Sequence, residues 1–121
     1  WGRIGDSPVI GAGTYAGNNS CAVSCTGHGE YFIRHAVAFD VCARYKYLKE
    51  SVEKAADYII HTELNTNAGN GGLIAVDKLG NIAMPYNSGG MFRGFLYKEK
   101  GSPEIKKGCG IGKKIVVVGE K

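Results

Sequence analysis

Glycine is distributed very unevenly along this 121-residue chain, and its placement divides the sequence into two glycine-containing regions and a central block without glycine. Seven glycines lie within residues 2–29, none lies within residues 30–68, and the remaining twelve begin at residue 69. The prolines stand at 8, 85 and 103, again outside the central block. Because both residue types disfavour helix interiors, the central block should contain the helices.

Two helices are predicted within that block. A helix over residues 30–46 would keep its charged side chains on one narrow strip and bury the others. Apolar residues between positions 52 and 60 recur at helical spacing, and Ser51 stands in the position of an N-cap.

Short β-rich runs flank the helices, at residues 9–10, 21–25, 73–77, 81–86 and 92–97. The sequence Lys-Leu-Gly at 78–80 separates two of these runs at hairpin spacing. Strands, two helices and further strands predict an α+β fold, in which a mostly antiparallel sheet is layered with helices.

The net charge of +4 is concentrated in residues 98–121, which hold seven Lys against three Glu, whereas residues 1–97 are balanced. A nucleic-acid-binding domain would carry its basic residues on its folded face. We therefore expect no nucleic-acid partner and a solvated basic tail over residues 101–121. The chain has no apolar run near the ~20 residues of a membrane span, so we also expect no membrane association and a cytoplasmic protein.

The four cysteines, at 21, 25, 42 and 109, are too few to indicate a disulfide-stapled scaffold. Cys21 and Cys25 are separated by three residues, and His28 is the only imidazole near them, which does not fit the usual spacing of a zinc site. Reduced, buried thiols and no bound metal are therefore expected.

Residues 11–16 match G-x-G-x-x-A, the pattern of a dinucleotide-binding turn. That pattern binds a pyrophosphate only where a helix follows it. Here Gly-Asn-Asn-Ser and a strand-like run follow, so a glycine-loosened strand and turn is predicted instead.

The segment Cys-Thr-Gly-His-Gly-Glu at 25–30 joins a predicted strand directly to the first predicted helix. Gly27 and Gly29 would let the backbone approach a ligand, and the Thr26 hydroxyl could help to stabilise an oxyanion. The same segment also suits a helix-capping turn with Thr26 or Gly27 near the N-cap. The local chemistry leaves both interpretations open.

Arg3 and Asp6 lie on either side of Gly5. A guanidinium binds a carboxylate in bidentate fashion, and a carboxylate binds an ammonium, so the pair could hold an α-amino acid head group. An ion pair on the surface of a turn is the simpler interpretation of the same two residues.

Four segments, in this order, resemble the plant-type L-asparaginase/isoaspartyl peptidase (beta-aspartyl-peptidase) family of N-terminal-threonine hydrolases. They are GRIGDSP at 2–8, GAGTYA at 11–16, SCTGHGE at 24–30 and IAMPYNSGGMFR at 82–93. The resemblance extends from residue 1 to about residue 97 and implies a precursor that cleaves itself. Its β-subunit would begin with a threonine that is the nucleophile and whose α-amine is the base.

This chain resembles that β-subunit without its first segment. Its threonines, at 14, 26, 62 and 66, are all internal, so none has the free α-amine that this chemistry requires. We therefore expect the chain alone to be inactive. The residues encoded before Trp1 would test this expectation.

The resemblance also implies roles for individual residues. Arg3 would bind the substrate α-carboxylate and Asp6 its α-ammonium, with the Gly29 carbonyl as a second ammonium contact. Thr26 and the Gly27 N–H would form the oxyanion hole. The implied substrate-binding set is completed by Ile4, Gly5 and His28. The implied reaction cleaves L-asparagine or a β-aspartyl dipeptide through a β-aspartyl ester and releases L-aspartate.

The implied fold is the four-layer αββα sandwich of N-terminal-nucleophile hydrolases, to which residues 1–100 would contribute the β-subunit portion. The implied partners are the α-subunit of the same precursor and a second αβ unit. No organic cofactor is implied, and a structural sodium would lie in the α-subunit; potassium dependence stays open. Residues 101–121 fall outside the resemblance, and runs at 108–112 and 115–118 could form an added strand or a partner-binding arm.

Two alternatives remain. Glycosylasparaginases share the implied fold and nucleophile, although Glu30 and residues 84–93 look more like the isoaspartyl branch. A non-catalytic fragment or binding module would keep only the aspartate clamp of Arg3 and Asp6.

Overall fold

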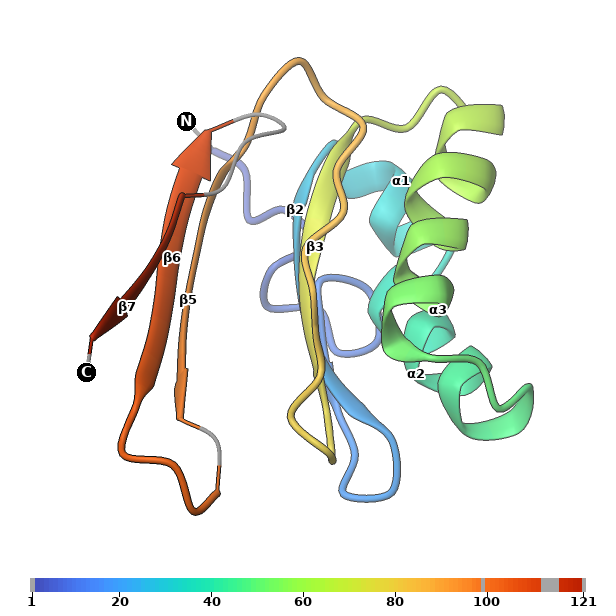
Figure 1. Ribbon diagram of the computed structural model, residues 1–121. Coiled ribbons are helices and arrows are strands. Elements are labelled where there is room, and N and C mark those ends of the chain that lie inside the picture. Colours follow the sequence, from blue (N-terminus) through green and yellow to red (C-terminus); the bar gives the residue numbers. More distant parts are fainter. Residues whose placement is uncertain (1, 99, 112–115, 121) are drawn as a thin grey trace. The chain divides into compact units, whose positions relative to one another are not determined.

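The computed structural model describes residues 2–98, 100–111 and 116–120 (Figure 1). Its contacts divide the chain into two compact units, Trp1–Ser88 and Gly89–Lys121. The first unit combines helices with a four-stranded sheet, and the second is a three-stranded sheet. All pairings between named strands are antiparallel, so the α+β class is confirmed. In the described residues, no helix is long and apolar enough to cross a membrane.

The sheet of the first unit has the strand order β1-β2-β3-β4. Its strands are β1 (Thr14–Ala16), β2 (Cys21–Gly27), β3 (Gly71–Asp77) and β4 (Ile82–Ala83). Side chains along β2 alternate between buried and exposed, because successive residues of a strand point to opposite faces of the sheet. The helices cover one of these faces (Figure 1).

The predicted strands agree with this sheet except at its margins. Residues 9–10 form a turn, in which the Val9 N–H donates to the Asp6 carbonyl at 2.9 Å, and Ile10 makes only an isolated bridge to Thr14. The strand prediction at 9–10 is therefore wrong. Residues 11–16 lead through a turn into β1 rather than into a helix, which confirms that the glycine pattern is not a dinucleotide-binding turn.

The first predicted helix is two helices, α1 (Gly29–Arg34) and α2 (Val37–Tyr47). Between them Ala36 adopts the left-handed conformation, with φ 46° and ψ 47°. Tertiary hydrogen bonds account for the break: the N–H groups of Ala38 and Phe39 donate to carbonyls in the 11–12 turn, at 3.0 and 2.8 Å. In a continuous helix these N–H groups would bond to the preceding turn instead.

The second predicted helix, α3 (Val52–Tyr58), begins as expected. The Ser51 hydroxyl accepts a hydrogen bond from the Lys54 N–H at 3.2 Å, which confirms the predicted N-cap. The helix then continues as a π-helix over Ile59–Leu64. The helical segment therefore extends beyond residue 60, where the predicted apolar pattern ends.

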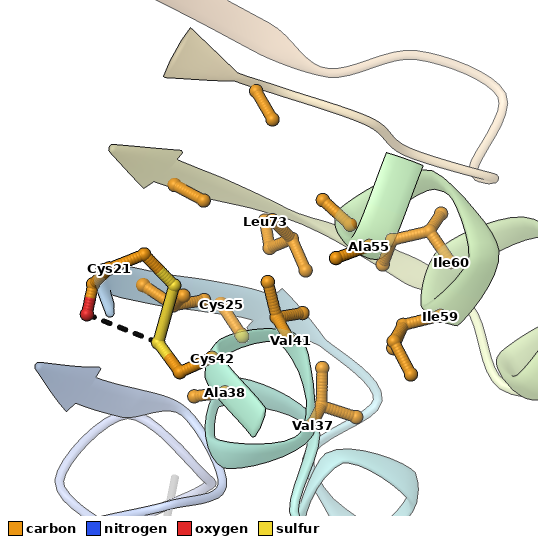
Figure 2. Close-up of a cluster of buried hydrophobic side chains, with 14 of the residues drawn as sticks. Cys21, Cys25, Val37, Ala38, Val41, Cys42, Ala55, Ile59, Ile60 and Leu73 are labelled. Atoms are coloured by element: carbon orange, nitrogen blue, oxygen red, sulfur yellow. Dashed lines mark hydrogen bonds between the residues drawn. A yellow bond between two sulfur atoms is a disulfide. The ribbon is translucent and has the colours of Figure 1, made fainter. Parts of the chain in front are cut away.

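The hydrophobic core lies between the sheet and the helices (Figure 2). Val37, Val41 and Ile60 from the helices pack with Leu73 of β3, and each is no more than 1% exposed. Complete burial of such side chains stabilises the fold by about 1.5–3 kcal/mol each. The core therefore holds β2 and β3, and the predicted site lies where β2 ends opposite the start of β3.

The expectation that all cysteines are reduced is wrong for one pair. Cys21 of β2 and Cys42 of α2 form a disulfide, with their Cα atoms 5.5 Å apart (Figure 2). The sequence could not reveal this because the two residues are 21 positions apart and meet only when α2 packs on β2. Cys25 and Cys109 are free thiols.

The second unit contains β5 (Phe92–Lys98), β6 (Ile105–Ile111) and β7 (Val116–Glu120), in that order. β6 pairs with β5 along its whole length, from Phe92 opposite Ile111 to Lys98 opposite Ile105. Residues 105–111 of the predicted tail therefore form a paired strand, and the prediction of a solvated tail is wrong there. The predicted run at 108–112 lies in β6 up to residue 111, and the run at 115–118 lies in β7 from residue 116. Residues 112 and 115 themselves lie outside the described residues.

Candidate functional site

The predicted site lies where β2 ends and α1 begins. Thr26 is paired with Gly72 and Gly27 with Gly71 across the sheet. His28 follows, and its backbone N–H donates to the Asn70 carbonyl at 2.8 Å. The chain therefore passes from sheet to helix with its backbone held by the start of β3.

The capping interpretation holds only in part, because Gly27 directly precedes the N-cap and Glu30 lies in the first turn of α1, but no side chain caps the helix. The N-cap of α1 is His28, and no side chain there makes a capping hydrogen bond. Thr26 is instead an exposed residue of β2. The His28 side chain is also exposed, and its ring lies 6.3 Å from the ring of Tyr31. The role of Thr26 and Gly27 in an oxyanion hole stays a prediction.

Gly27 and Gly71 approach one another too closely for any other residue. A β-carbon at Gly27 would collide with the Asn70 carbonyl, and one at Gly71 would collide with the carbonyl of Thr26. Both positions also have φ values, +152° and +157°, that L side chains rarely adopt. This contact fixes the Gly27 backbone against β3 with little freedom to shift.

Asp6 is the most unusual residue at the site. It is only 5% exposed, and its Oδ2 has no hydrogen-bond partner among the described residues. Arg3 is exposed and forms no ion pair with Asp6. The interpretation of these two residues as a surface ion pair is therefore wrong.

The first turn of α1 lies against Asp6. A β-carbon at Gly29 would lie 3.0 Å from the Asp6 nitrogen, 3.1 Å from its Oδ1 and 3.4 Å from the Cα of Gly5. On the other side, a β-carbon at Gly13 would collide with the Asp6 carbonyl. Glycine at 29 thus lets α1 approach the Asp6 side chain, and glycine at 13 lets the 11–13 turn pack on the Asp6 main chain. The glycine pattern at 11–16 serves this packing.

The Asp6 carboxylate also acts on its neighbour Cys25. Burial, with a further contribution from the negative charge of Asp6, raises the pKa of the Cys25 thiol from 9.0 to about 12. The thiol is therefore neutral at physiological pH. A buried carboxylate oxygen without a partner is costly, so the site is suited to receive a cationic hydrogen-bond donor such as an ammonium group.

The structure brings together only part of the predicted set. Gly5, Asp6 and Gly29 are in contact, and Thr26, Gly27 and His28 directly precede Gly29. Arg3 and Ile4 lie in the exposed segment before Asp6, where Ile4 is 84% exposed. In the part of the chain that the structure describes, no three His, Cys, Asp or Glu side chains gather as they would around a metal ion.

Sequence reasoning missed Asn87. Its side-chain amide forms hydrogen bonds with the Ile60 carbonyl in the π-helix, with Asn65 and Gly69 in the connection that follows, and with Gly71 at the start of β3. Asn87 stands within the 82–93 segment that carries the family resemblance, but nothing local distinguishes it from the polar turn residues beside it. Only its long-range contacts reveal that it supports the strand opposite Gly27.

Comparison with known proteins adds independent findings. A family model described as asparaginase matches residues 1–105. The chain is 51% identical over 96 residues to the isoaspartyl peptidase of Salmonella typhimurium, covering 79% of this chain and 31% of that protein. It is 52% identical over 93 residues to the probable isoaspartyl peptidase/L-asparaginase 2 of Arabidopsis thaliana, covering 77% of this chain and 28% of that protein.

Similarity extends to animals. The isoaspartyl peptidase/L-asparaginase of Homo sapiens is 41% identical over 90 residues, which cover 74% of this chain and 29% of the human protein. The chain thus spans less than a third of the length of these three relatives.

Proposed function

Since this chain belongs to the asparaginase family, we propose that it forms the β-subunit portion of an N-terminal-threonine amidohydrolase. The proposed enzyme cleaves L-asparagine, β-aspartyl dipeptides or both, and releases L-aspartate. The observation that carries this proposal is the buried Asp6 carboxylate, whose Oδ2 has no partner among the described residues and whose other oxygen faces Gly29.

Asp6 is proposed to bind the α-ammonium of the substrate, together with the Gly29 carbonyl. An ammonium supplies both a positive charge and hydrogen-bond donors, which are what a buried, unpaired carboxylate lacks. Burial strengthens the pair because the surrounding medium screens the charges less than water does. Arg3, on the exposed segment before Asp6, is proposed to bind the α-carboxylate through its planar guanidinium. Ile4, Gly5 and His28 would line the same pocket.

Thr26 and Gly27 are proposed to stabilise the oxyanion. Thr26 is an exposed residue at the end of β2. The close contact between Gly27 and Gly71 restricts the position of the Gly27 N–H. Donors that are fixed before the reaction stabilise developing charge without a cost of reorganisation. This rigidity supports the role.

The nucleophile is proposed to be an N-terminal threonine that precedes residues 1–121, because every threonine of this chain is internal. Its hydroxyl would attack the side-chain carbonyl of the substrate while its α-amine accepts the proton. The resulting oxyanion would lie against Thr26 and Gly27. Loss of ammonia or of an amine, protonated by the same group, leaves a β-aspartyl ester, and water then releases L-aspartate and restores the hydroxyl.

The proposed partners are an α-subunit and a second αβ unit, assembled as the αββα sandwich. One feature supports a covering layer: Ile74 and Val76 lie on the face of β3 opposite the helices and are 52% and 45% exposed. Apolar side chains on that face are suited to pack against a second sheet.

The proposal is tested in the complete enzyme, meaning residues 1–121 assembled with the α-subunit and the threonine-initiated segment. Asp6→Asn should weaken the binding of L-aspartate about 10- to 100-fold in calorimetry, because a hydrogen bond between charged groups is lost. Arg3→Ala should do the same, and Arg3→Lys should restore only part of the affinity.

Asp77→Asn is the matched control, because Asp77 is equally buried, at 6% exposed, but its carboxylate already has partners within the chain. Its affinity for L-aspartate should be unchanged. If Asp6→Asn and Arg3→Ala both bind L-aspartate as tightly as the wild type, the assignment of the clamp is wrong.

A further inference from the structure

We propose that Asn87 is a positioning residue for the oxyanion hole, acting through the start of β3. This inference rests on the proposed function, because it concerns the same Thr26 and Gly27 donors. It extends that function to a residue that lies outside the segments 2–6 and 26–29 assigned to the substrate.

The first step is the set of hydrogen bonds that Asn87 makes. Its Oδ1 accepts from the Gly71 N–H at 2.8 Å, and its Nδ2 donates to the Gly69 carbonyl at 2.9 Å and to the Asn65 Oδ1 at 2.8 Å. The Nδ2 also lies 3.3 Å from the Ile60 carbonyl, and the Asn87 backbone N–H donates to the Gly71 carbonyl at 2.9 Å. One residue therefore holds Gly71 by both its N–H and its carbonyl.

The second step leads from Gly71 to the proposed donors. Gly71 is paired with Gly27, and a β-carbon on Gly71 would collide with the Thr26 carbonyl and lie 2.8 Å from the Cα of Gly27. The adjacent Asn70 carbonyl accepts the hydrogen bond from the His28 N–H at 2.8 Å. A shift of residues 70–71 would therefore move the backbone on both sides of the Gly27–His28 peptide.

The third step is the reason an amide is needed there. The chain leaves the π-helix through an irregular turn, in which Ala68 is left-handed with φ 58° and the Gly69 N–H donates to the Leu64 carbonyl at 2.7 Å. Backbone groups in such a turn have no partners from regular secondary structure and need others. A carboxamide combines one acceptor with two donor hydrogens, so it can satisfy an N–H and carbonyls on either side of the turn at once.

The same sheet offers a matched control in Asn81. Its side chain also makes a hydrogen bond within the fold, donating to the Asp77 Oδ2 at 2.8 Å, but it belongs to the β3–β4 turn at the other end of β3. A change at Asn81 should weaken the fold without reaching Gly27. Asn65→Ala is a second control, because it removes a partner of Asn87 on the helix side and leaves the bonds to Gly71 and Gly69 in place.

The experiment compares Asn87→Ala, Asn81→Ala and Asn65→Ala in the complete enzyme. For Asn87→Ala we expect kcat to fall roughly 10- to 100-fold, because small displacements of catalytic groups have effects of that size. KM and L-aspartate affinity should change less than about twofold, since the contacts of Asp6 do not pass through residues 69–71. Asn81→Ala and Asn65→Ala should keep the wild-type kcat even where the melting temperature falls.

Asn87→Asp keeps an oxygen that accepts from the Gly71 N–H and replaces the donor group with a second, charged oxygen that faces the Gly69 and Ile60 carbonyls, so it is a second test of the donor bonds if Asn87→Ala does not assemble. It should also lower kcat. In a Thr26→Val background, the loss caused by either Asn87 variant should be clearly smaller than in the wild type, because both changes act on the same donors.

Two results would overturn the inference: an Asn87 variant that lowers only the melting temperature, or losses in kcat that add fully to those of Thr26→Val. The proposed function fails on different evidence, namely unchanged kcat in Thr26→Val and unchanged L-aspartate binding in Asp6→Asn. If those two variants behave as expected while Asn87 variants keep their kcat, only the positioning role is wrong.

Discussion

Two aspartates of the first unit are buried to a similar extent but differ in whether their carboxylates are hydrogen-bonded. Asp6 is 5% exposed and Asp77 is 6% exposed. Asp77 accepts hydrogen bonds from the Leu79 and Asn81 N–H groups at 2.8 and 2.9 Å and from the Asn81 amide at 2.8 Å. Asp6 has no partner for its Oδ2 among the described residues.

The titration of Asp77 reflects its partners. Burial alone would raise its pKa, but hydrogen bonds from Asn81 and Leu79 outweigh burial and hold the pKa below its ordinary value of 3.8. Asp77 is thus a closed structural site that shapes the β3–β4 turn. Asp6 keeps an acceptor oxygen without a hydrogen-bond partner among the described residues, beside Gly29. Satisfied hydrogen bonds mark the Asp77 carboxylate as one that stabilises the fold, and the unsatisfied oxygen marks the Asp6 carboxylate as one suited to bind a ligand.

The largest expected effect is a loss of kcat when a proposed oxyanion donor at the end of β2 is removed. Thr26→Val keeps the branched shape and removes the hydroxyl, so kcat of the complete enzyme should fall on the order of a hundredfold, equivalent to ~3 kcal/mol, with a much smaller change in KM. Steady-state kinetics and the melting temperature should be measured together. A lower melting temperature with unchanged kcat would refute the oxyanion role.

The next largest expected effect is a loss of stability when the hydrogen-bonded carboxylate of Asp77 is removed. Asp77→Ala leaves the Leu79 and Asn81 N–H groups without their acceptor, so we expect a loss of about 2 kcal/mol in the free energy of unfolding. Denaturant titration measures this loss, and kcat should be retained. A stable Asp77→Ala variant would show that the hydrogen bonds of this turn contribute little.

A smaller effect of opposite sign is expected at the open site. Asp6→Asn removes an uncompensated buried charge, so the ligand-free enzyme should become more stable by about 1 kcal/mol while L-aspartate binds about 10- to 100-fold more weakly. The melting temperature without ligand should therefore rise. A clear fall would mean that Asp6, like Asp77, stabilises the fold through contacts of its own.

The smallest effect is the pH dependence of the closed site. A carboxylate whose pKa is lowered by folding contributes stability that is fully present above its unfolded pKa and is lost as the pH falls through its folded pKa. The difference in stability between the wild type and Asp77→Asn should thus be constant from about pH 7 to 5 and shrink below about pH 4. A difference that persists in acid would contradict the lowered pKa of Asp77.

Much of the fold could be predicted from local patterns. In the described residues the helices lie in the glycine-free block apart from Gly29 at the start of α1, Ser51 caps α3, and the runs at 21–25, 73–77 and 92–97 lie within strands. The break at Ala36 could not be predicted, because the bonds that favour it come from the 11–12 turn. The same holds for the disulfide between Cys21 and Cys42.

For the site, the sequence by itself determined which residues are candidates and in what order they lie. It could not decide between an ion pair and a clamp at Arg3 and Asp6, or between a cap and a ligand-facing strand end at Thr26, because each motif fits both interpretations locally. Burial and pairing, which arise only when distant segments meet, exclude the surface ion pair and place Thr26 within β2, whereas the clamp and the ligand-facing role remain proposals. Asn87 illustrates the reason. Its side-chain oxygen accepts a hydrogen bond from the Gly71 N–H at 2.8 Å, and only the folded sheet brings these two residues, sixteen positions apart, together.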